Sequence, residues 1–109
     1  MTDLTVHATY RVILGKEEEF FRLLGLHWPT LNELSLVTDH PVTHFHRRDQ
    51  NGRMTIVEIF TWKSVEASKA AHGHPKVAAI WEPMCALCED RDSFPAMDFP
   101  HYTRFSPVK

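Results

Sequence analysis

Hydrophobic and polar residues alternate with a period of two near the start of the chain. Over residues 4–14, one side carries Val6, Ala8, Tyr10, Val12 and Leu14, and the other carries Thr5, His7, Thr9, Arg11 and Ile13. This alternation, rich in β-branched residues, predicts a strand with one face on a core. Gly15 ends the pattern, and the acidic run Glu17–Glu19 that follows is typical of the first turn of a helix.

Helical spacing replaces the alternation after this point. The residues that recur on one helical face are Phe20, Leu23, Leu24, Trp28 and Leu31. They predict a helix to about Ser35. Pro29 lies inside this pattern, so we expect a kink there, or one helix ending and another starting.

Two further strands are expected over residues 42–48 and 53–62, joined by a tight turn at Asp49–Gly52. The pair Asn51-Gly52 favours the positive φ angles that a hairpin turn needs. On the second strand His44 and His46 share a face. On the third strand one face carries Met54, Ile56, Glu58, Phe60 and Trp62, and the other carries Thr55, Val57, Ile59 and Thr61.

The second half of the chain predicts two short helices and a last strand. Ser64 is a suitable N-cap for a helix through His72, which Gly73 ends. His74-Pro75 starts a second helix that runs to about Glu89, residues 93–95 form a loop, and residues 101–105 form a strand. This order predicts an α+β, ferredoxin-like βαββαβ fold, with a four-stranded antiparallel sheet and helices on one face, as a single domain over residues 1–109.

One sheet face would then remain without helices. It carries apolar residues, among them Ile13, Phe45, Val57 and Ile59. A contiguous apolar patch of this kind indicates a partner, and a twofold homodimer packed sheet to sheet would bury it.

Composition narrows the function classes. The 109 residues carry a net charge of -2 and no basic stripe, so no nucleic-acid partner is expected. No apolar run reaches 18 residues, so no membrane partner is expected either. The N-terminus lacks an export signal and the two cysteines do not form a disulfide scaffold, so we expect a cytoplasmic protein.

A segment from the third strand into the next helix resembles the antibiotic biosynthesis monooxygenase-like proteins. It reads Glu58-Ile-Phe-Thr-Trp62-Lys-Ser64-Val-Glu-Ala67, followed by Ala71-His72 and Pro75-Lys-Val77. The entry to the first helix, Gly15-Lys16-Glu17-Glu18-Glu19-Phe20, is also similar, and the resemblance covers roughly residues 5–90. It implies a dimeric α+β barrel with a pocket between sheet and helices. Some members oxidise quinols or polycyclic phenols with molecular oxygen and neither metal nor flavin, and others have no established activity.

The haem-degrading branch of the same barrel provides a separate comparison. Its members use a Trp and, ten residues later, a His ligand on the second helical segment. These positions fall at His72 and near Glu82 here. Neither residue type matches, so haem degradation is not expected.

Two residues are candidates for acid–base chemistry. A neutral His72 imidazole could accept a phenolic proton near pH 7, although a His that stabilises a helix C-terminus would look the same. Glu58 lies on an otherwise apolar strand face, where a raised pKa would suit catalysis. Its structural alternative is a buried salt bridge with Arg11 or Arg104.

Other clusters have weaker support. His44 and His46, with His7 or His101 on a neighbouring strand, could bind a metal, but alternate polar positions lining a pocket explain them better. Cys85 and Cys88 lie in a predicted helix and are expected to be buried core residues.

The aromatic residues favour a flat aromatic ligand. The residues expected to contact it are Tyr10, His44, His46, Phe60, Trp62 and Trp81. The sequence therefore favours a cofactor-free monooxygenase of a quinol, anthrone or other electron-rich phenol, with His72 and then Glu58 as the base. The alternative is a non-catalytic dimeric barrel that binds a small aromatic molecule.

Overall fold

The structure is a computed structural model that describes residues 4–103 and 106–107. Its elements are β1 (Leu4–Val12), α1 (Glu17–Glu33), β2 (Thr43–Arg48), β3 (Met54–Trp62), α2 (Val65–His72), α3 (Pro75–Ala86), β4 (Met97–Asp98) and β5 (His101–Tyr102). The strands form one antiparallel sheet in the order β2-β3-β1-β4, and β5 also pairs with β1. The predicted ferredoxin-like α+β fold is confirmed.

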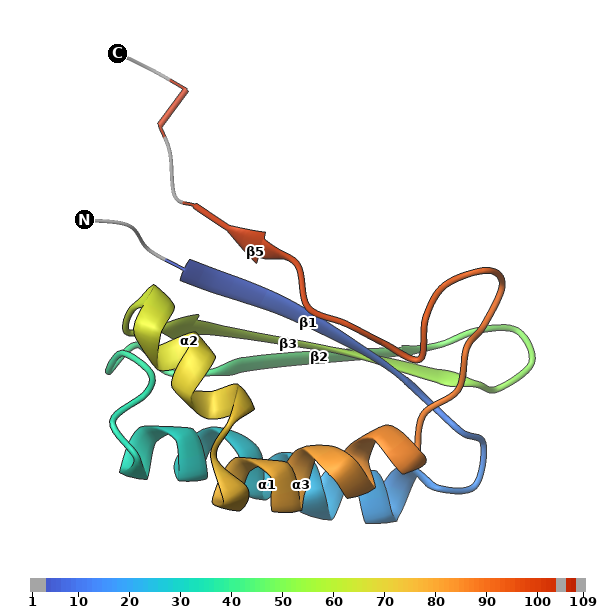
Figure 1. Ribbon diagram of the computed structural model, residues 1–109. Helices are drawn as coiled ribbons and strands as arrows, with labels where there is room; N and C mark the ends of the chain where they lie inside the picture. The colour runs from blue at the N-terminus through green and yellow to red at the C-terminus, as the bar shows by residue number, and fades with distance from the viewer. Residues whose placement is uncertain (1–3, 104–105, 108–109) are drawn as a thin grey trace.

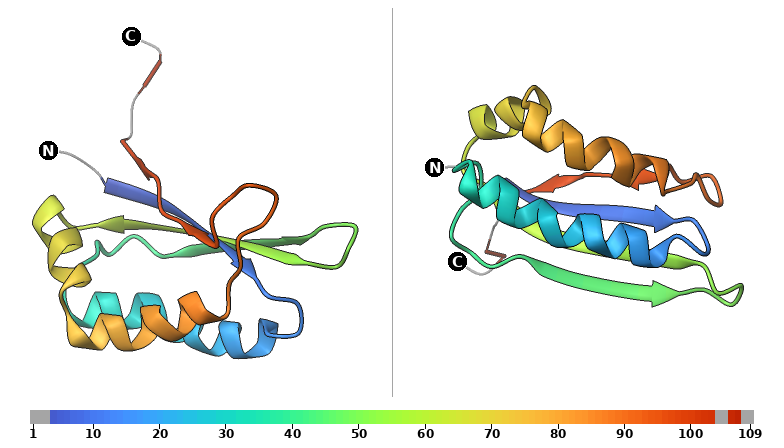
Figure 2. Two further views of the ribbon diagram at one scale, coloured as in Figure 1. Left: turned by 45° about the vertical axis from the view of Figure 1, so that its right-hand side comes forward. Right: turned by 90° about the horizontal axis from the view of Figure 1, so that it is seen from below.

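The molecule has two layers. The sheet forms one layer, and α1 and α3 lie side by side against one of its faces (Figures 1 and 2). The short helix α2 connects the end of β3 to α3 at one end of the sheet (Figure 1). None of the described helices is long and apolar enough to cross a membrane.

The core lies between these layers, and the alternation on β1 and β3 determines which residues enter it. On β1 these are Val6, Ala8, Tyr10 and Val12, and on β3 they are Met54, Ile56, Glu58, Phe60 and Trp62. Burial of this apolar surface is the main favourable term for folding. Leu14, expected to continue the buried set, is 60% exposed because β1 ends at Val12.

Helix α1 places five side chains against the sheet. Its buried residues are Phe20, Leu23, Leu24, His27 and Leu31. Their spacing follows the 3.6-residue period, so His27 occupies a core position although it is polar. Pro29 does not end the helix, which continues to Glu33.

The β2–β3 hairpin differs from the prediction in its turn. Of the pair Asn51-Gly52, only Gly52 has a positive φ, at 80°. The Asp49 side chain completes the turn by accepting hydrogen bonds from the backbone N–H groups of Asn51 and Arg53. The turn therefore has one residue in the left-handed region, Gly52, where the absence of Cβ removes the steric cost of a positive φ.

The connection into α2 and α3 follows the prediction closely. The Ser64 side chain accepts a hydrogen bond from the Ala67 backbone N–H and caps α2, and Gly73 is the C-cap. The His74 side chain accepts one from Lys76 N–H at the start of α3. This local chemistry places His72 at the end of α2, beside the first turn of α3.

The C-terminal segment contains a short strand, β4, that was not predicted from the sequence. β4 pairs with β1 at Thr9 and Tyr10, and β5 pairs with β1 at Thr5 and Val6. The fourth position of the sheet is therefore shared by two short strands. Within the predicted strand over residues 101–105, the structure has a strand at His101–Tyr102, and Arg104 and Phe105 lie outside the described residues.

No described helix covers the second face of the sheet (Figure 2). Val57 and Ile59 are half-buried there, and Phe45 is 56% exposed. A sheet face with such apolar residues is typical of an interaction surface.

Candidate active site

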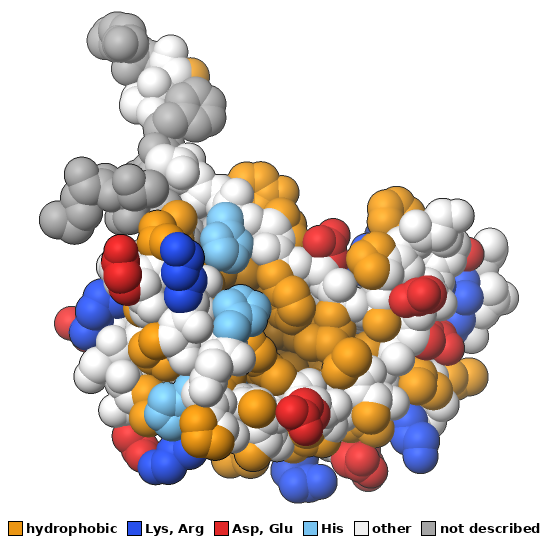
Figure 3. Space-filling model, in the orientation of Figure 1, with side chains coloured by type: hydrophobic (Ala, Val, Ile, Leu, Met, Phe, Trp, Pro, Cys, Tyr) orange, Lys and Arg blue, Asp and Glu red, His pale blue; other side chains and the backbone are white. Residues whose placement is uncertain are grey.

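A cavity of about 360 Å³ opens between the sheet and the helices α2 and α3. Figure 3 shows it as a hollow with hydrophobic side chains at its base and histidine side chains along one rim. The lining residues are Val6, His27, Phe60, Trp62, His72, Trp81, Glu82, Cys85, Met97, Phe99 and His101. The expected pocket between sheet and helices is therefore present, and its size lies in the range of small-molecule sites.

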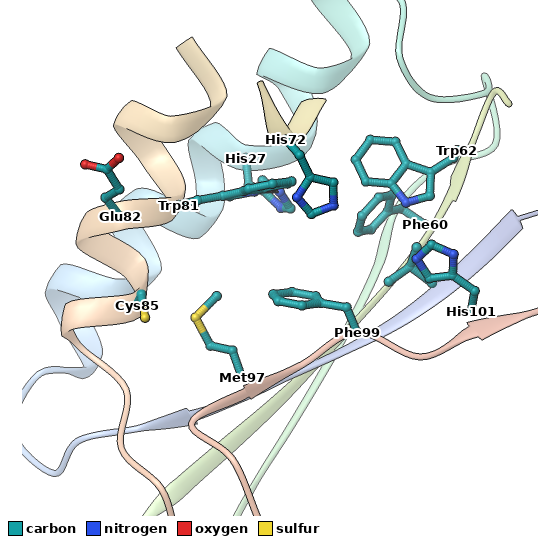
Figure 4. Close-up of a pocket in the computed structure, with 11 residues that line it drawn as sticks. His27, Phe60, Trp62, His72, Trp81, Glu82, Cys85, Met97, Phe99 and His101 are labelled. Carbon is teal, nitrogen blue, oxygen red and sulfur yellow. Dashed lines mark hydrogen bonds between the residues drawn. The ribbon is translucent and has the colours of Figure 1, made fainter. Parts of the chain in front are cut away.

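Aromatic rings form most of its walls. Trp81 is stacked with Phe99, with ring centroids 6.5 Å apart, and meets the His72 ring edge-on at 5.1 Å. Phe60 and Trp62 pack edge to face at 5.1 Å on the β3 side. Figure 4 shows the cavity between Trp81 and His72 on one side and Met97 and Phe99 on the other. Such a lining suits a flat, apolar ligand.

Trp62 brings an unused hydrogen-bond donor to this lining. Its side chain is 4% exposed, and among the described residues no acceptor lies within reach of its buried Nε1–H. A buried N–H without a partner costs about 1–3 kcal/mol. The Trp62 ring lines the cavity, so a small rotation of the indole would bring this N–H to an oxygen atom of a bound ligand.

His72 is an exposed histidine of the cavity wall. It is the last residue of α2, and its ring contacts Trp81. Within the described part of the chain, its side chain makes no hydrogen bond. A neutral imidazole in this position can accept a proton from a ligand at the mouth of the cavity.

Glu58 lies behind the cavity wall and not in it. It is fully buried, and three side chains donate hydrogen bonds to its carboxylate: Tyr10 Oη to Oε1 at 2.7 Å, His27 Nδ1 to Oε1 at 2.8 Å, and His44 Nε2 to Oε2 at 3.0 Å. Arg11, one of the expected partners, instead binds the Pro95 carbonyl. The other, Arg104, lies outside the described residues.

These donors reverse the expected pKa of Glu58. Burial alone would raise it, but the hydrogen bonds from His27, His44 and Tyr10 outweigh burial and lower the pKa to about 2. The prediction of a raised pKa is wrong, because three donors gather around the buried carboxylate. Glu58 is therefore ionised at neutral pH and is a weak base.

The same contacts affect Tyr10. Burial, and then the neighbouring Glu58 charge, raise the pKa of Tyr10 well above its ordinary value. Its hydroxyl therefore stays protonated as a donor to Glu58. Tyr10 does not line the cavity but supports its floor, packing against Phe20 and Phe99.

A second hydrogen bond connects this buried group to the cavity. The Trp81 indole Nε1–H donates to Nε2 of His27 at 2.7 Å. His27 is 1% exposed and bridges the Glu58 carboxylate and the Trp81 indole. Trp81, in the cavity wall, is thus connected through His27 to the buried charge of Glu58.

The remaining predicted residues lie elsewhere. His44 and His46 face the helix side of the edge strand β2, where they line a shallow groove with Phe21 and Leu24 rather than the aromatic cavity. Of the expected ligand contacts, the structure brings Phe60, Trp62 and Trp81 to the cavity with His72. It does not bring Tyr10, His44 or His46 there.

The histidines weighed as metal ligands are divided between the two faces of the sheet. His7 pairs with Ile59 on the face opposite to His44 and contacts the Tyr102 ring, so it cannot join His44 and His46. Within the ranges that the structure describes, no group of three or more His, Cys, Asp or Glu side chains is arranged to hold a metal ion.

The two cysteines differ in their surroundings. Cys88 is buried, as expected, and burial raises its pKa to about 12. Cys85 is exposed and lines the cavity, which corrects the expectation that both are core residues. The reason is that α3 ends at Ala86, so Cys88 follows the helix instead of sharing a face with Cys85.

Sequence reasoning missed several cavity residues. His27 follows Phe20 by seven residues, a spacing that identifies the buried helix face. Met97, Phe99 and His101 come from the segment that forms β4 and β5, whose two-residue strands leave no periodic signal. For these three, no pattern in the sequence could have placed them at the cavity.

No protein-family model matches the sequence, and a comparison with curated proteins also finds no match. Solved structures do match. A variant of SnoaB, a cofactor-independent oxygenase from Streptomyces nogalater, has a TM-score of 0.71 and 15% identity, covering 97% of this chain and 96% of that one. A candidate antibiotic biosynthesis monooxygenase from Nitrosomonas europaea has a TM-score of 0.69 and 9% identity, covering 99% and 94%.

A third match is a dimeric ferredoxin-like protein of unknown function from Jannaschia sp. CCS1. Its TM-score is 0.64 at 15% identity, covering 91% of this chain and 97% of that one. At such identities the likeness is one of fold. The chain therefore has the ferredoxin-like fold of the antibiotic biosynthesis monooxygenase-like proteins that its sequence resembles.

Proposed function

We propose that the protein is a cofactor-independent monooxygenase that oxidises a quinol, an anthrone or another electron-rich phenol in the aromatic cavity. The observation that carries the proposal is the pairing of Trp62 and His72 in that cavity. Trp62 carries a buried N–H that has no acceptor among residues 4–103 and 106–107, and His72 carries an accessible imidazole. The fold shared with SnoaB, a cofactor-independent oxygenase, supports the same reaction class.

The cavity suits the binding step. A planar ring system can stack against Trp81 and Phe99, with Phe60 and Val6 closing the sheet side. The Trp62 indole turns toward the ligand, whose hydroxyl or carbonyl oxygen then accepts a hydrogen bond from the Trp62 N–H. This contact satisfies a buried donor that finds no partner in the described part of the chain, so it favours a ligand with an oxygen substituent over a pure hydrocarbon.

The chemistry begins with a proton transfer. His72 removes a proton from the substrate, and the Trp62 N–H stabilises the negative charge that develops on the substrate oxygen. The anion passes one electron to molecular oxygen, which gives a substrate radical and superoxide. Their combination forms a carbon–oxygen bond in a peroxide anion, which takes back the proton held by His72 and becomes a hydroperoxide. The hydroperoxide then loses water, made from its outer OH group and the hydrogen left on the same carbon, and the new carbonyl group remains. The apolar walls keep water from the radical pair.

Glu58 takes a supporting role in this scheme. Because the pKa of Glu58 is lowered to about 2, its carboxylate does not compete with His72 for the substrate proton. Its contribution is made through His27, which it binds directly.

The test is oxygen consumption by purified, metal-analysed protein with a panel of naphthoquinols and anthrones. Boiled protein corrects for autoxidation, because these substrates react slowly with oxygen unaided. His72→Ala should lose most of the saturable rate. His40→Ala is the matched control, since His40 is exposed and lies away from the cavity. Saturable ligand binding without oxygen uptake across the panel would replace this proposal with the non-catalytic binding protein.

We also propose that the protein is a homodimer. The uncovered sheet face, with Phe45, Val57 and Ile59, is the surface that a second copy would bury. A structural neighbour with 91% coverage of this chain is described as dimeric, which supports this arrangement. Twofold pairing is the commonest way to bury such a face.

A further inference from the structure

His27 forms hydrogen bonds with two polar neighbours, of which one accepts from its ring and the other donates to it. The Glu58 carboxylate, on β3, also takes hydrogen bonds from Tyr10 Oη and His44 Nε2, so it meets His27 as an acceptor and Nδ1 of His27 must carry a hydrogen. Trp81, on α3, can only donate through its indole N–H, so Nε2 of His27 must be bare. The network therefore requires the neutral Nδ1–H tautomer of His27.

Both remaining protonation states of the ring break a contact. The Nε2–H tautomer would face the Trp81 N–H with another N–H and would turn a lone pair toward the Glu58 carboxylate. The doubly protonated ring would keep the bond to Glu58 but leave the Trp81 N–H against an N–H at 2.7 Å. Unmade hydrogen bonds at a site that is 1% exposed are costly.

Glu58 is in turn held by groups outside the cavity. Tyr10 on β1 and His44 on β2 occupy the carboxylate positions that His27 leaves free. The Glu58 carboxylate is therefore held from two strands, and the orientation of His27 follows from it. Hydrogen bonds thus connect Tyr10 and His44 to Glu58. Glu58 is bonded to His27, and His27 is bonded to Trp81.

Trp81 connects this buried hydrogen-bond network to the cavity. It is the only one of the three tryptophans whose indole N–H has an acceptor among the described residues, since the N–H groups of Trp28 and Trp62 have none. The torsion that orients an indole plane is broad on its own. The bond to His27 selects one orientation, in which the ring stacks with Phe99 and meets His72.

We propose that His27 is a positioning residue: Glu58 holds it as the neutral Nδ1–H tautomer, and its Nε2 fixes Trp81 as the wall on which an aromatic ligand stacks. The proposal rests on the proposed function only for the aromatic nature of the ligand. Histidine suits the position because it donates with one nitrogen and accepts with the other. Lysine and arginine only donate, and leucine does neither.

Two substitutions separate positioning from simple packing. His27→Gln keeps a donor for Glu58 and an acceptor for Trp81, whereas His27→Leu fills space without either. Proton–nitrogen NMR of the wild type should show His27 with a hydrogen on Nδ1 and none on Nε2. Trp81→Phe assigns the Trp81 indole signal, and the Trp28 and Trp62 indoles serve as references within the same molecule.

The expected results are specific. In His27→Leu the Trp81 indole proton moves upfield toward the other two indoles, and 1-anilinonaphthalene-8-sulfonate binds the cavity roughly tenfold more weakly. In His27→Gln both properties stay near the wild type. A Trp81 signal unchanged in His27→Leu, or a hydrogen on Nε2 of wild-type His27, would overturn the proposal.

These readouts are independent of turnover. If no panel substrate is oxidised but the tautomer and the Trp81 shifts are as expected, the proposed function fails and the positioning role stands. If a substrate is oxidised but the Trp81 signal does not change in His27→Leu, the proposed function stands and the positioning role fails. Amide spectra of each variant show whether its fold is intact. If the fold of His27→Leu is disrupted, the tautomer of His27 in the wild type decides the proposal.

Discussion

His44 lies directly opposite Glu58 in the β2–β3 register, and its Nε2 donates to Oε2 of that buried carboxylate at 3.0 Å. The relationship explains how a charge can occupy the centre of an otherwise apolar strand face. Two core residues, Tyr10 and His27, donate to Oε1, and His44 of the exposed edge strand β2 provides the last donor. A buried charge that accepts several hydrogen bonds is far less costly than an isolated one.

The first prediction concerns pH and stability. The pKa of Glu58 is lowered to about 2 in the folded protein, so its stabilising effect is complete above its unfolded value near 4.5. The effect is lost as pH falls toward 2, and its full size is on the order of 3 kcal/mol. Urea unfolding should show Glu58→Gln less stable than the wild type at pH 7, with the gap narrowing below about pH 5.

Glu17 and Asp49 also have lowered pKa values, but both are present in the wild type and the variant and cancel in the comparison. A gap that stays constant down to acid pH would contradict the assignment of Glu58 as a buried carboxylate anion.

The second prediction isolates the Tyr10 hydroxyl. Tyr10→Phe keeps the buried ring but removes a donor to the charged Glu58, and hydrogen bonds to charged groups contribute about 1.5–3 kcal/mol. Chemical denaturation should show a loss of that size. Tyr102→Phe is the control, because Tyr102 is 52% exposed, and we expect a change within about 0.5 kcal/mol. Equal effects of the two substitutions would argue against the hydrogen bond.

The third prediction tests the Trp62 N–H. Trp62→Phe retains an aromatic wall and removes the donor proposed to bind the substrate oxygen, so kcat/KM should fall roughly tenfold to a hundredfold. Trp28→Phe is a matched control, since the Trp28 N–H is also buried with no acceptor among the residues that the structure describes, but Trp28 lies outside the cavity. Steady-state oxygen uptake compares them. A Trp62→Phe enzyme as active as Trp28→Phe would exclude the proposed contact.

The fourth prediction addresses the open sheet face. Val57→Lys places a charge in the middle of the surface proposed for the second copy, on the side of β3 that points away from the cavity. Analytical ultracentrifugation should show a dimer for the wild type and a monomer for the variant. The exposed Val65 of α2 provides a control, because Val65→Lys lies outside this face and should remain dimeric. A monomeric wild type would refute the dimer.

Much of the fold could be predicted because its signals are local. The alternation on β1 and β3, the Ser64 cap and the Gly73 stop each depend on neighbouring residues, and the structure has all of them. The errors arose where a signal was short or ambiguous. Pro29 is tolerated inside α1, and the pairs of residues in β4 and β5 are too short to show a period.

The candidate site was predictable only in part, for a related reason. Trp62, Phe60, Trp81 and His72 follow from a strand and helices whose faces the pattern defines. The partners of Glu58 do not, because Tyr10, His27 and His44 come from three elements whose side-chain contacts depend on tertiary packing. The wrong expectation for the pKa of Glu58 has this origin, since burial can be read from the sequence and the donors cannot.

The most direct test of the central claim is saturable oxygen uptake by metal-free protein on the naphthoquinol and anthrone panel, with wild type, His72→Ala and His40→Ala side by side. General-base catalysis contributes about 10²–10⁴-fold, so His72→Ala should lose at least a hundredfold of the enzymatic rate while His40→Ala keeps it. A rate equal to autoxidation for every substrate, or a His72→Ala protein as active as the wild type, would contradict the account.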